Sequence, residues 1–112
     1  MVYMKIAIIG SRGLKIDNIG DFLPVGVSEI VSGGARGIDE CAKNYAIENG
    51  IKYVEFLPKY NVYGRFAPLK RNLEIIEYSD SVIAFWDGKS KGTDFVIKEC
   101  NKIGREVKVV SM

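Results

Sequence analysis

The sequence contains no histidine and only two cysteines. Histidine is the usual side chain for proton transfer and metal binding near neutral pH, so its absence excludes histidine-based catalysis and most zinc sites. Cys41 and Cys100 form no Cys-x-x-Cys pattern, and each lies on the apolar stripe of an expected helix. We therefore expect buried free thiols, no bound metal and no resident cofactor.

Long apolar runs are missing as well. None approaches the ~18 residues that a membrane-spanning helix needs, and the first residues lack the pattern of a signal peptide. We therefore expect a cytoplasmic protein without a membrane partner. The net charge of +2 is too small to indicate a nucleic-acid partner by itself.

The remaining composition is that of one globular domain. The 112 residues are 47% hydrophobic and 27% charged, close to a soluble average, and no repeat, linker or low-complexity tract interrupts them. We expect a single domain over residues 1–112.

Short apolar runs alternate with amphipathic segments along the whole chain. The pattern predicts strands over 5–9, 27–31, 53–57, 82–86 and 107–110. It predicts helices over 17–23, 37–48 and 93–102, a further helix from Pro68 onward, and a long loop over 58–67. The expected inward stripes of the last three helices are Ile38, Cys41, Ala42 and Tyr45, then Leu69, Leu73 and Ile76, then Val96, Cys100 and Ile103.

This alternation predicts an α/β fold: a Rossmann-like, doubly wound three-layer sandwich around a five-stranded parallel sheet. We expect the strand order 3-2-1-4-5, with a flavodoxin-like order as the alternative. In either order the carboxyl ends of the strands meet at one edge of the sheet, where open α/β sheets bind their ligands.

Glycine clusters follow three of the expected strands. Gly10-Ser11-Arg12-Gly13 follows the first strand. Its backbone N–H groups and the Ser11 hydroxyl can lie under a phosphate, although a strand-to-helix turn also needs glycine. The spacing is not Gly-x-Gly-x-x-Gly, so a dinucleotide fingerprint is not supported.

The second cluster is Ser32-Gly33-Gly34-Ala35-Arg36-Gly37-Ile38-Asp39. A single tight turn rarely needs three glycines, so Gly33, Gly34 and Gly37 indicate close approach of a ligand to the backbone. We expect Arg36 to meet a phosphate or a carboxylate. Asp39 either accepts a hydrogen bond from a ribose hydroxyl or complements the dipole of the following helix.

The third cluster runs from Trp86 to Thr93. Gly88-Lys89-Ser90 is similar to the end of a P-loop, but that motif needs glycine where Ile83 stands. Gly92-Thr93 instead indicates a helix N-terminus, with Thr93 as its cap or as a phosphate ligand. Trp86 can stack on a base with Asp87 as an acceptor, or it is a large core or interface residue.

Arg71 and Asn72 open the expected third helix. Asn72 falls close to the apolar stripe, where a polar side chain needs a partner from a ligand or from the backbone. Arg71 is read as either a ligand contact or an ordinary residue of a solvated face. The aromatic residues of the preceding loop, Tyr60, Tyr63 and Phe66, are candidates for a pocket wall or a dimer contact.

Taken in order, these motifs resemble those of the short stand-alone, YspA-like members of the SLOG superfamily, which also contains the Smf/DprA proteins and the Lonely Guy phosphoribohydrolases. The resemblance is carried by 10–12, 33–39, 63–65, 71–72, 84–88 and 90–93, so it extends over nearly the whole chain. It implies a Rossmann-like domain that binds nucleotides or their derivatives. When the Lonely Guy motif Gly-Gly-x-Gly-Thr-x-x-Glu is aligned on Gly92-Thr93, its glutamate falls on Val96, so Asp39 or Asp87 would have to replace that carboxylate.

Two functions follow from these expectations. The first is a sensor or binding module for a nucleotide or nucleotide-derived phosphorylated ligand, and the alternative is an enzyme that cleaves the N-glycosidic bond of nucleoside monophosphates. DprA-like relatives bind single-stranded DNA, but the absence of an extended basic tract argues against that partner here. A homodimer that completes the cleft is a further expectation by analogy. The expected ligand-binding residues are Gly10, Ser11, Arg12, Gly33, Gly34, Arg36, Gly37, Asp39, Arg71, Asn72, Trp86, Asp87, Gly88, Ser90, Gly92 and Thr93.

Overall fold

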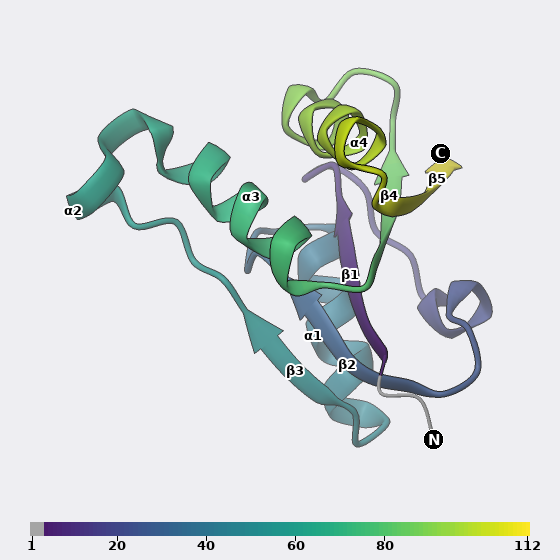
Figure 1. Ribbon diagram of the computed structural model, residues 1–112. Coiled ribbons are helices and arrows are strands. Elements are labelled where there is room, and N and C mark those ends of the chain that lie inside the picture. Colours follow the sequence, from purple (N-terminus) through teal and green to yellow (C-terminus); the bar gives the residue numbers. More distant parts are fainter. Residues whose placement is uncertain (1–3) are drawn as a thin grey trace.

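The computed structural model describes residues 4–112 as a five-stranded parallel sheet with helices on both faces (Figure 1). The strand order β3-β2-β1-β4-β5 confirms the predicted doubly wound order and rules out the flavodoxin-like alternative. The order reverses between β1 and β4, so the crevice expected of such folds opens at the carboxyl ends of these two strands. The strands are β1 (Met4–Gly10), β2 (Val27–Ser32), β3 (Lys52–Glu55), β4 (Ser81–Trp86) and β5 (Glu106–Ser111).

The sheet is the middle of three layers. Helix α1 (Ile38–Glu48) and the short 3₁₀-helix η1 (Ile19–Phe22) cover one face. Helices α3 (Ala67–Tyr78) and α4 (Lys91–Ile103) cover the opposite face, as Figure 1 shows. Among residues 4–112, no helix is long and apolar enough to cross a membrane.

The central strand β1 fixes the core because it is buried on both faces. Ile6 and Ile8 pack with the side chains under α1, whereas Ala7 and Ile9 pack with those under α3 and α4. Successive side chains of a strand point to opposite faces, so one apolar run supplies both halves of the core.

The helix predicted over 17–23 is wrong, since only the 3₁₀ turn η1 forms there. A Cβ atom at Gly20 would lie 2.6 Å from the hydroxyl of Tyr45, so this segment packs too closely on α1 to carry a larger side chain. Pro24 follows one residue after the cap of η1 and stops any continuation. The loop predicted over 58–67 is also partly helical, because it contains α2 (Tyr60–Tyr63) and the 3₁₀-helix η2 (Gly64–Phe66).

The inward face of α3 differs from the predicted stripe. The residues buried on this helix are Ala67, Arg71, Ile75 and Ile76, while Leu69 is 40% exposed. Ala67, Arg71 and Ile75 are spaced four residues apart and therefore lie on one face of the helix. The apolar pattern of the sequence did not reveal this face because a charged residue stands at its centre.

Helix α4 begins two residues earlier than predicted, at Lys91. Its N-cap is Ser90, so the alternative that Thr93 caps the helix is wrong: Ser90 Oγ accepts a hydrogen bond from the backbone N–H of Thr93. The helix ends at Gly104, which adopts the left-handed conformation with φ of 78°. Ile103 stands just before this end and is 52% exposed, so its predicted inward position is wrong, whereas Val96 and Cys100 are buried as expected. Both cysteines are free, but only Cys100 is fully buried.

The loops after β1 and β2 touch each other at Gly37. This glycine has φ of 77°, and a Cβ atom built on it would lie 2.4 Å from the carbonyl oxygen of Arg12 and 2.8 Å from that of Leu14. Gly37 therefore allows two backbones to pack together, which explains it without a ligand.

We expect Gly37→Ala to lower the free energy of unfolding by about 1–3 kcal/mol more than Gly50→Ala, as measured by urea denaturation. Gly50 also has a positive φ, 65°, but the space around it is open. Gly50→Ala therefore reports the backbone strain alone, about 1–2 kcal/mol. Equal losses in the two variants would contradict the close backbone contact.

Candidate functional site

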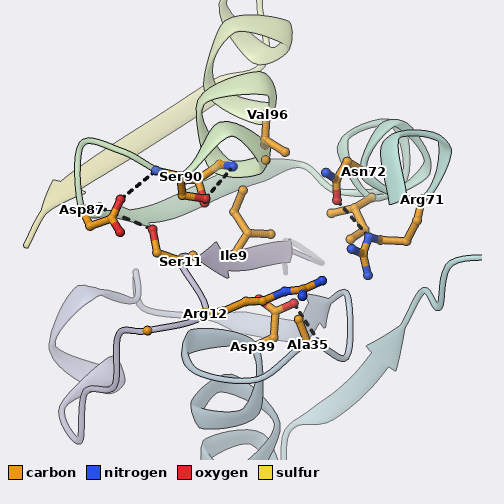
Figure 2. Close-up of a pocket in the computed structure, with 15 residues that line it drawn as sticks. Ile9, Ser11, Arg12, Ala35, Asp39, Arg71, Asn72, Asp87, Ser90 and Val96 are labelled. Carbon is orange, nitrogen blue, oxygen red and sulfur yellow. Dashed lines mark hydrogen bonds between the residues drawn. The ribbon is translucent and has the colours of Figure 1, made fainter. Parts of the chain in front are cut away.

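A cavity of about 350 Å³ opens at the carboxyl ends of β1 and β4, where the strand order reverses (Figure 2). Its walls come from the end of β1, from the loops after β1, β2 and β4, and from side chains of α1, α3 and α4. Segments far apart in the sequence thus meet at one edge of the sheet. The lining residues are Ile9, Gly10, Ser11, Arg12, Gly13, Ala35, Asp39, Arg71, Asn72, Ile75, Asp87, Ser90, Gly92, Thr93 and Val96.

The cavity brings together most of the residues that the sequence singled out. Those that line it are Gly10, Ser11, Arg12, Asp39, Arg71, Asn72, Asp87, Ser90, Gly92 and Thr93. Those that do not are Gly33, Gly34, Arg36, Gly37, Trp86 and Gly88.

Sequence reasoning missed the apolar floor of the cavity. Ile9, Ile75 and Val96 belong to the core side chains under α3 and α4, and each also lines the cavity. The sequence gives no separate signal for them, because a core residue and a cavity floor have the same apolar pattern. Ala35 and Gly13 were also missed, although both stand inside glycine clusters that had been recognised.

The loop after β4 is held by its own hydrogen bonds. Asp87 Oδ1 accepts hydrogen bonds from the backbone N–H groups of Lys89 and Ser90, each at 2.8 Å. These bonds hold the pKa of the Asp87 carboxyl below its usual value. Trp86 donates its indole N–H to the carbonyl oxygen of Ser90 at 3.0 Å. The geometry thus gives Trp86 and Asp87 a role in shaping the loop.

A buried hydroxyl joins this loop to the loop after β1. Ser11 is 2% exposed, and its backbone N–H donates to the carbonyl oxygen of Phe85 at 3.2 Å. Its Oγ accepts a hydrogen bond from the backbone N–H of Asp87 at 3.4 Å. Ser11 therefore fixes the relative positions of the two loops that flank the reversal in strand order.

Arg71 is buried beside the cavity, and its interpretation as a residue of a solvated face is wrong. Only 8% of the residue is exposed. Its Nη1 donates to the carbonyl oxygen of Gly33 at 2.5 Å, and its Nε donates to Asn72 Oδ1 at 2.9 Å. Burial lowers the pKa of Arg71, and no carboxylate within residues 4–112 lies at ion-pair distance from it.

Gly33 makes room for this arginine. A Cβ atom at Gly33 would lie 2.6 Å from Arg71 Nη1. The close approach inferred from the glycine cluster is therefore real, but the group that approaches is the chain's own guanidinium. Gly10 is explained in a similar way, because its Cβ would meet the side chain of Ile38 at 2.5 Å.

Asp39 is a buried carboxyl with one unsatisfied oxygen. The residue is 5% exposed, and its Oδ2 accepts a hydrogen bond from the backbone N–H of Ala35 at 3.2 Å. Its Oδ1 has no hydrogen-bond partner in the described part of the chain. Burial raises the pKa of Asp39, against the opposing effects of the Ala35 N–H, the Arg71 guanidinium, the nearby Gly33 N–H and the Arg12 guanidinium. Such an atom at a cavity wall is a ready acceptor for a ligand.

The opposite wall of the cavity is the N-terminus of α4. Gly92 lies in its first turn and lines the cavity, and no atom lies within 4 Å of a Cβ built on it. The first N–H groups of a helix carry a partial positive charge and bind anions. Figure 2 shows Arg12 reaching into the space between this end of α4 and Asp39. Within residues 4–112, no group of three or more acidic or cysteine side chains is placed to hold a metal ion.

A scan against protein-family models, a search of curated proteins and a search of solved structures each found no match.

We expect Asp39→Asn to be increasingly more stable than the wild type as the pH rises. A carboxyl whose pKa is raised on folding makes the folded state lose stability as the pH rises from the unfolded value, 3.8, through the folded value. Asparagine does not ionise, so the variant does not lose the roughly 1.4 kcal/mol of unfolding free energy that the wild type loses for each unit by which the pKa is raised. Urea denaturation at a series of pH values measures the difference.

The matched control is Asp17→Asn, which neutralises an exposed aspartate outside the cavity. Its stability relative to the wild type should change little with pH. A constant difference between Asp39→Asn and the wild type at every pH would show that Asp39 is not desolvated.

Proposed function

We propose that the cavity binds a nucleotide or a nucleotide-derived phosphorylated ligand and that the protein works as a binding module or sensor. The observation that carries this proposal is the convergence of Arg12, Arg71 and the N-terminus of α4 on one cavity at the reversal in strand order. Positive groups gathered at this position of an α/β sheet suit an anion held beside a larger organic group.

In this proposal the phosphate lies between the first turn of α4 and Arg12. Gly92 has no side chain to cover the first turn of α4, whose N–H groups would bind the phosphate, and the exposed guanidinium of Arg12 supplies a planar pair of donors. Arg71 already donates hydrogen bonds to Gly33 and Asn72, so its contribution to phosphate binding is mainly its positive charge beside the cavity. A sugar hydroxyl next to the phosphate would then donate to Asp39 Oδ1.

The proposal includes membership of the SLOG superfamily, as a short stand-alone member. The sheet order and the meeting of the motifs at Gly10–Arg12, Asp39, Arg71–Asn72 and Ser90–Thr93 in one cavity support this resemblance.

We expect Arg12→Ala to weaken the binding of nucleoside monophosphates at least about tenfold, which corresponds to about 1.4 kcal/mol. Thermal-shift titration of the purified protein with AMP, GMP, CMP and UMP gives the affinities. Arg65→Ala removes the same charge outside the cavity, where Arg65 packs on the ring of Phe66, and should leave affinity unchanged.

A second variant separates ligand binding from folding. Gly92 lines the cavity and has open space where a Cβ would lie, so we expect Gly92→Ala to weaken binding while stability is unchanged or slightly higher. If wild-type protein binds none of the nucleotides, or if Arg12→Ala and Gly92→Ala bind them as the wild type does, the proposed phosphate site is wrong.

A second candidate function, hydrolysis of the N-glycosidic bond of nucleoside monophosphates, is favoured by the state of Asp39. A buried carboxyl with a raised pKa that lines a ligand cavity is suited to proton transfer or to stabilising positive charge on the sugar. Asp87 is less suited, because its Oδ1 already holds the loop after β4. Val96, the position of the Lonely Guy glutamate, contributes an apolar side chain to the cavity.

If the protein is such an enzyme, incubation with nucleoside monophosphates will release free base and ribose 5-phosphate, and Asp39→Asn will lower the rate about 100-fold or more while nucleotide affinity changes much less. Chromatographic separation of base from nucleotide measures the reaction. Tight binding without any release of base would leave the binding module as the function.

A further inference from the structure

A second cavity, of about 200 Å³, lies beside the first. It shares two lining residues with it, Ala35 and Asp39. The new wall is formed by Arg36 and by side chains of α1 and β3, namely Glu40, Lys43, Tyr53 and Glu55. Arg36, which the sequence singled out and the first cavity does not include, therefore belongs to this neighbouring space.

Part of this second cavity is held in a fixed arrangement. Tyr53 donates its hydroxyl hydrogen to Glu55 Oε1 at 3.0 Å, and the hydroxyl oxygen of Tyr53 lies 3.2 Å from Ser32 Oγ. Desolvation and the neighbouring Glu55 carboxylate raise the pKa of Tyr53, so the phenol stays protonated and keeps this bond at neutral pH. Lys43 lies over the Tyr53 ring, 6.0 Å from its centre. The second oxygen of Glu55 has no partner within residues 4–112 and is available to a ligand.

The charges of the second cavity do not favour another phosphate. Arg36 and Lys43 are balanced by Glu40 and Glu55, and the side chains of Arg36 and Glu40 make no hydrogen bond or ion pair with the rest of residues 4–112. Carboxylates accept hydrogen bonds and give none when ionised, so Glu55 and Glu40 suit N–H or O–H donors. The planar guanidinium of Arg36 suits the face of an aromatic ring.

We propose that the second cavity binds the base of the nucleotide whose phosphate lies in the first cavity, and that Glu55 selects bases with an exocyclic amino group. This inference rests on the proposed function. The sugar would lie at the shared wall, where the buried Asp39 Oδ1 has no hydrogen-bond partner among residues 4–112. The base would lie next to Ala35, and its amino group would donate to the Glu55 oxygen that is not bonded to Tyr53. A base with a carbonyl oxygen at that position would meet a carboxylate and be disfavoured.

The test compares two matched pairs of ligands, AMP with IMP and CMP with UMP, in which an amino group is exchanged for a carbonyl oxygen. We expect wild-type protein to bind the amino member of at least one pair about tenfold more tightly. Glu55→Gln should abolish this preference, because its amide can donate to the carbonyl oxygen. The affinity for ribose 5-phosphate should stay unchanged in the variant.

Glu48→Gln, which removes a carboxylate from the far end of α1, is the matched control and should keep the preference. Because Glu55 also accepts a hydrogen bond from Tyr53, Glu40→Gln provides a second variant at an exposed side chain that makes no hydrogen bond or ion pair within residues 4–112, and it should reduce the preference.

The outcomes separate the two proposals. If wild-type protein binds none of these nucleotides or ribose 5-phosphate, both the phosphate site and the base site are wrong. If the nucleotides bind but AMP matches IMP and CMP matches UMP, the base site is overturned while the phosphate site stands. The same follows if Glu55→Gln and Glu40→Gln both keep the wild-type preference.

Discussion

The hydrogen bond from Arg71 to the carbonyl oxygen of Gly33 is the interaction on which the site depends. It joins the first half of α3 to the end of β2, so it sets the distance between two walls of the larger cavity. It also places a guanidinium in a buried position without a carboxylate at ion-pair distance in residues 4–112. A buried positive charge that is bonded only to neutral oxygens favours an anion nearby. The same contact explains why Gly33 carries no side chain.

The charged groups around the two cavities follow one another from the first cavity, across the shared wall, to the second cavity. The N-terminus of α4 and Arg12 stand at one end, the half-satisfied carboxyl of Asp39 stands at the shared wall, and Glu55 stands at the far end. The donors of α4 and Arg12 suit a phosphate, whereas the carboxylates of Asp39 and Glu55 suit hydrogen-bond donors. The arrangement therefore matches a molecule that carries a phosphate at one end and hydrogen-bond donors at the other. A binding module and a hydrolase need the same arrangement, and they differ only in whether Asp39 holds a hydroxyl or takes part in breaking a bond.

The glycine clusters follow the strands, and a cavity lies at the edge of the sheet where they meet. However, Gly10, Gly33 and Gly37 are explained by the close packing of the protein's own atoms, whereas Gly13 and Gly92 line the cavity and have open space where a Cβ would lie. Glycine allows any group to come close, so a sequence cannot tell a ligand from a neighbouring loop.

The order of the elements, the parallel sheet and the edge at which the polar motifs meet follow from the residue pattern alone, because hydrophobic periodicity and the handedness of crossovers leave few other arrangements. The residue pattern placed most of the cavity-lining residues for the same reason. The folded chain was needed to show that Arg71 is buried, that Trp86 and Arg36 lie outside the main cavity, and that one oxygen of Asp39 has no partner among residues 4–112. These properties depend on contacts between segments that are distant in the chain, and local patterns of residues do not contain that information.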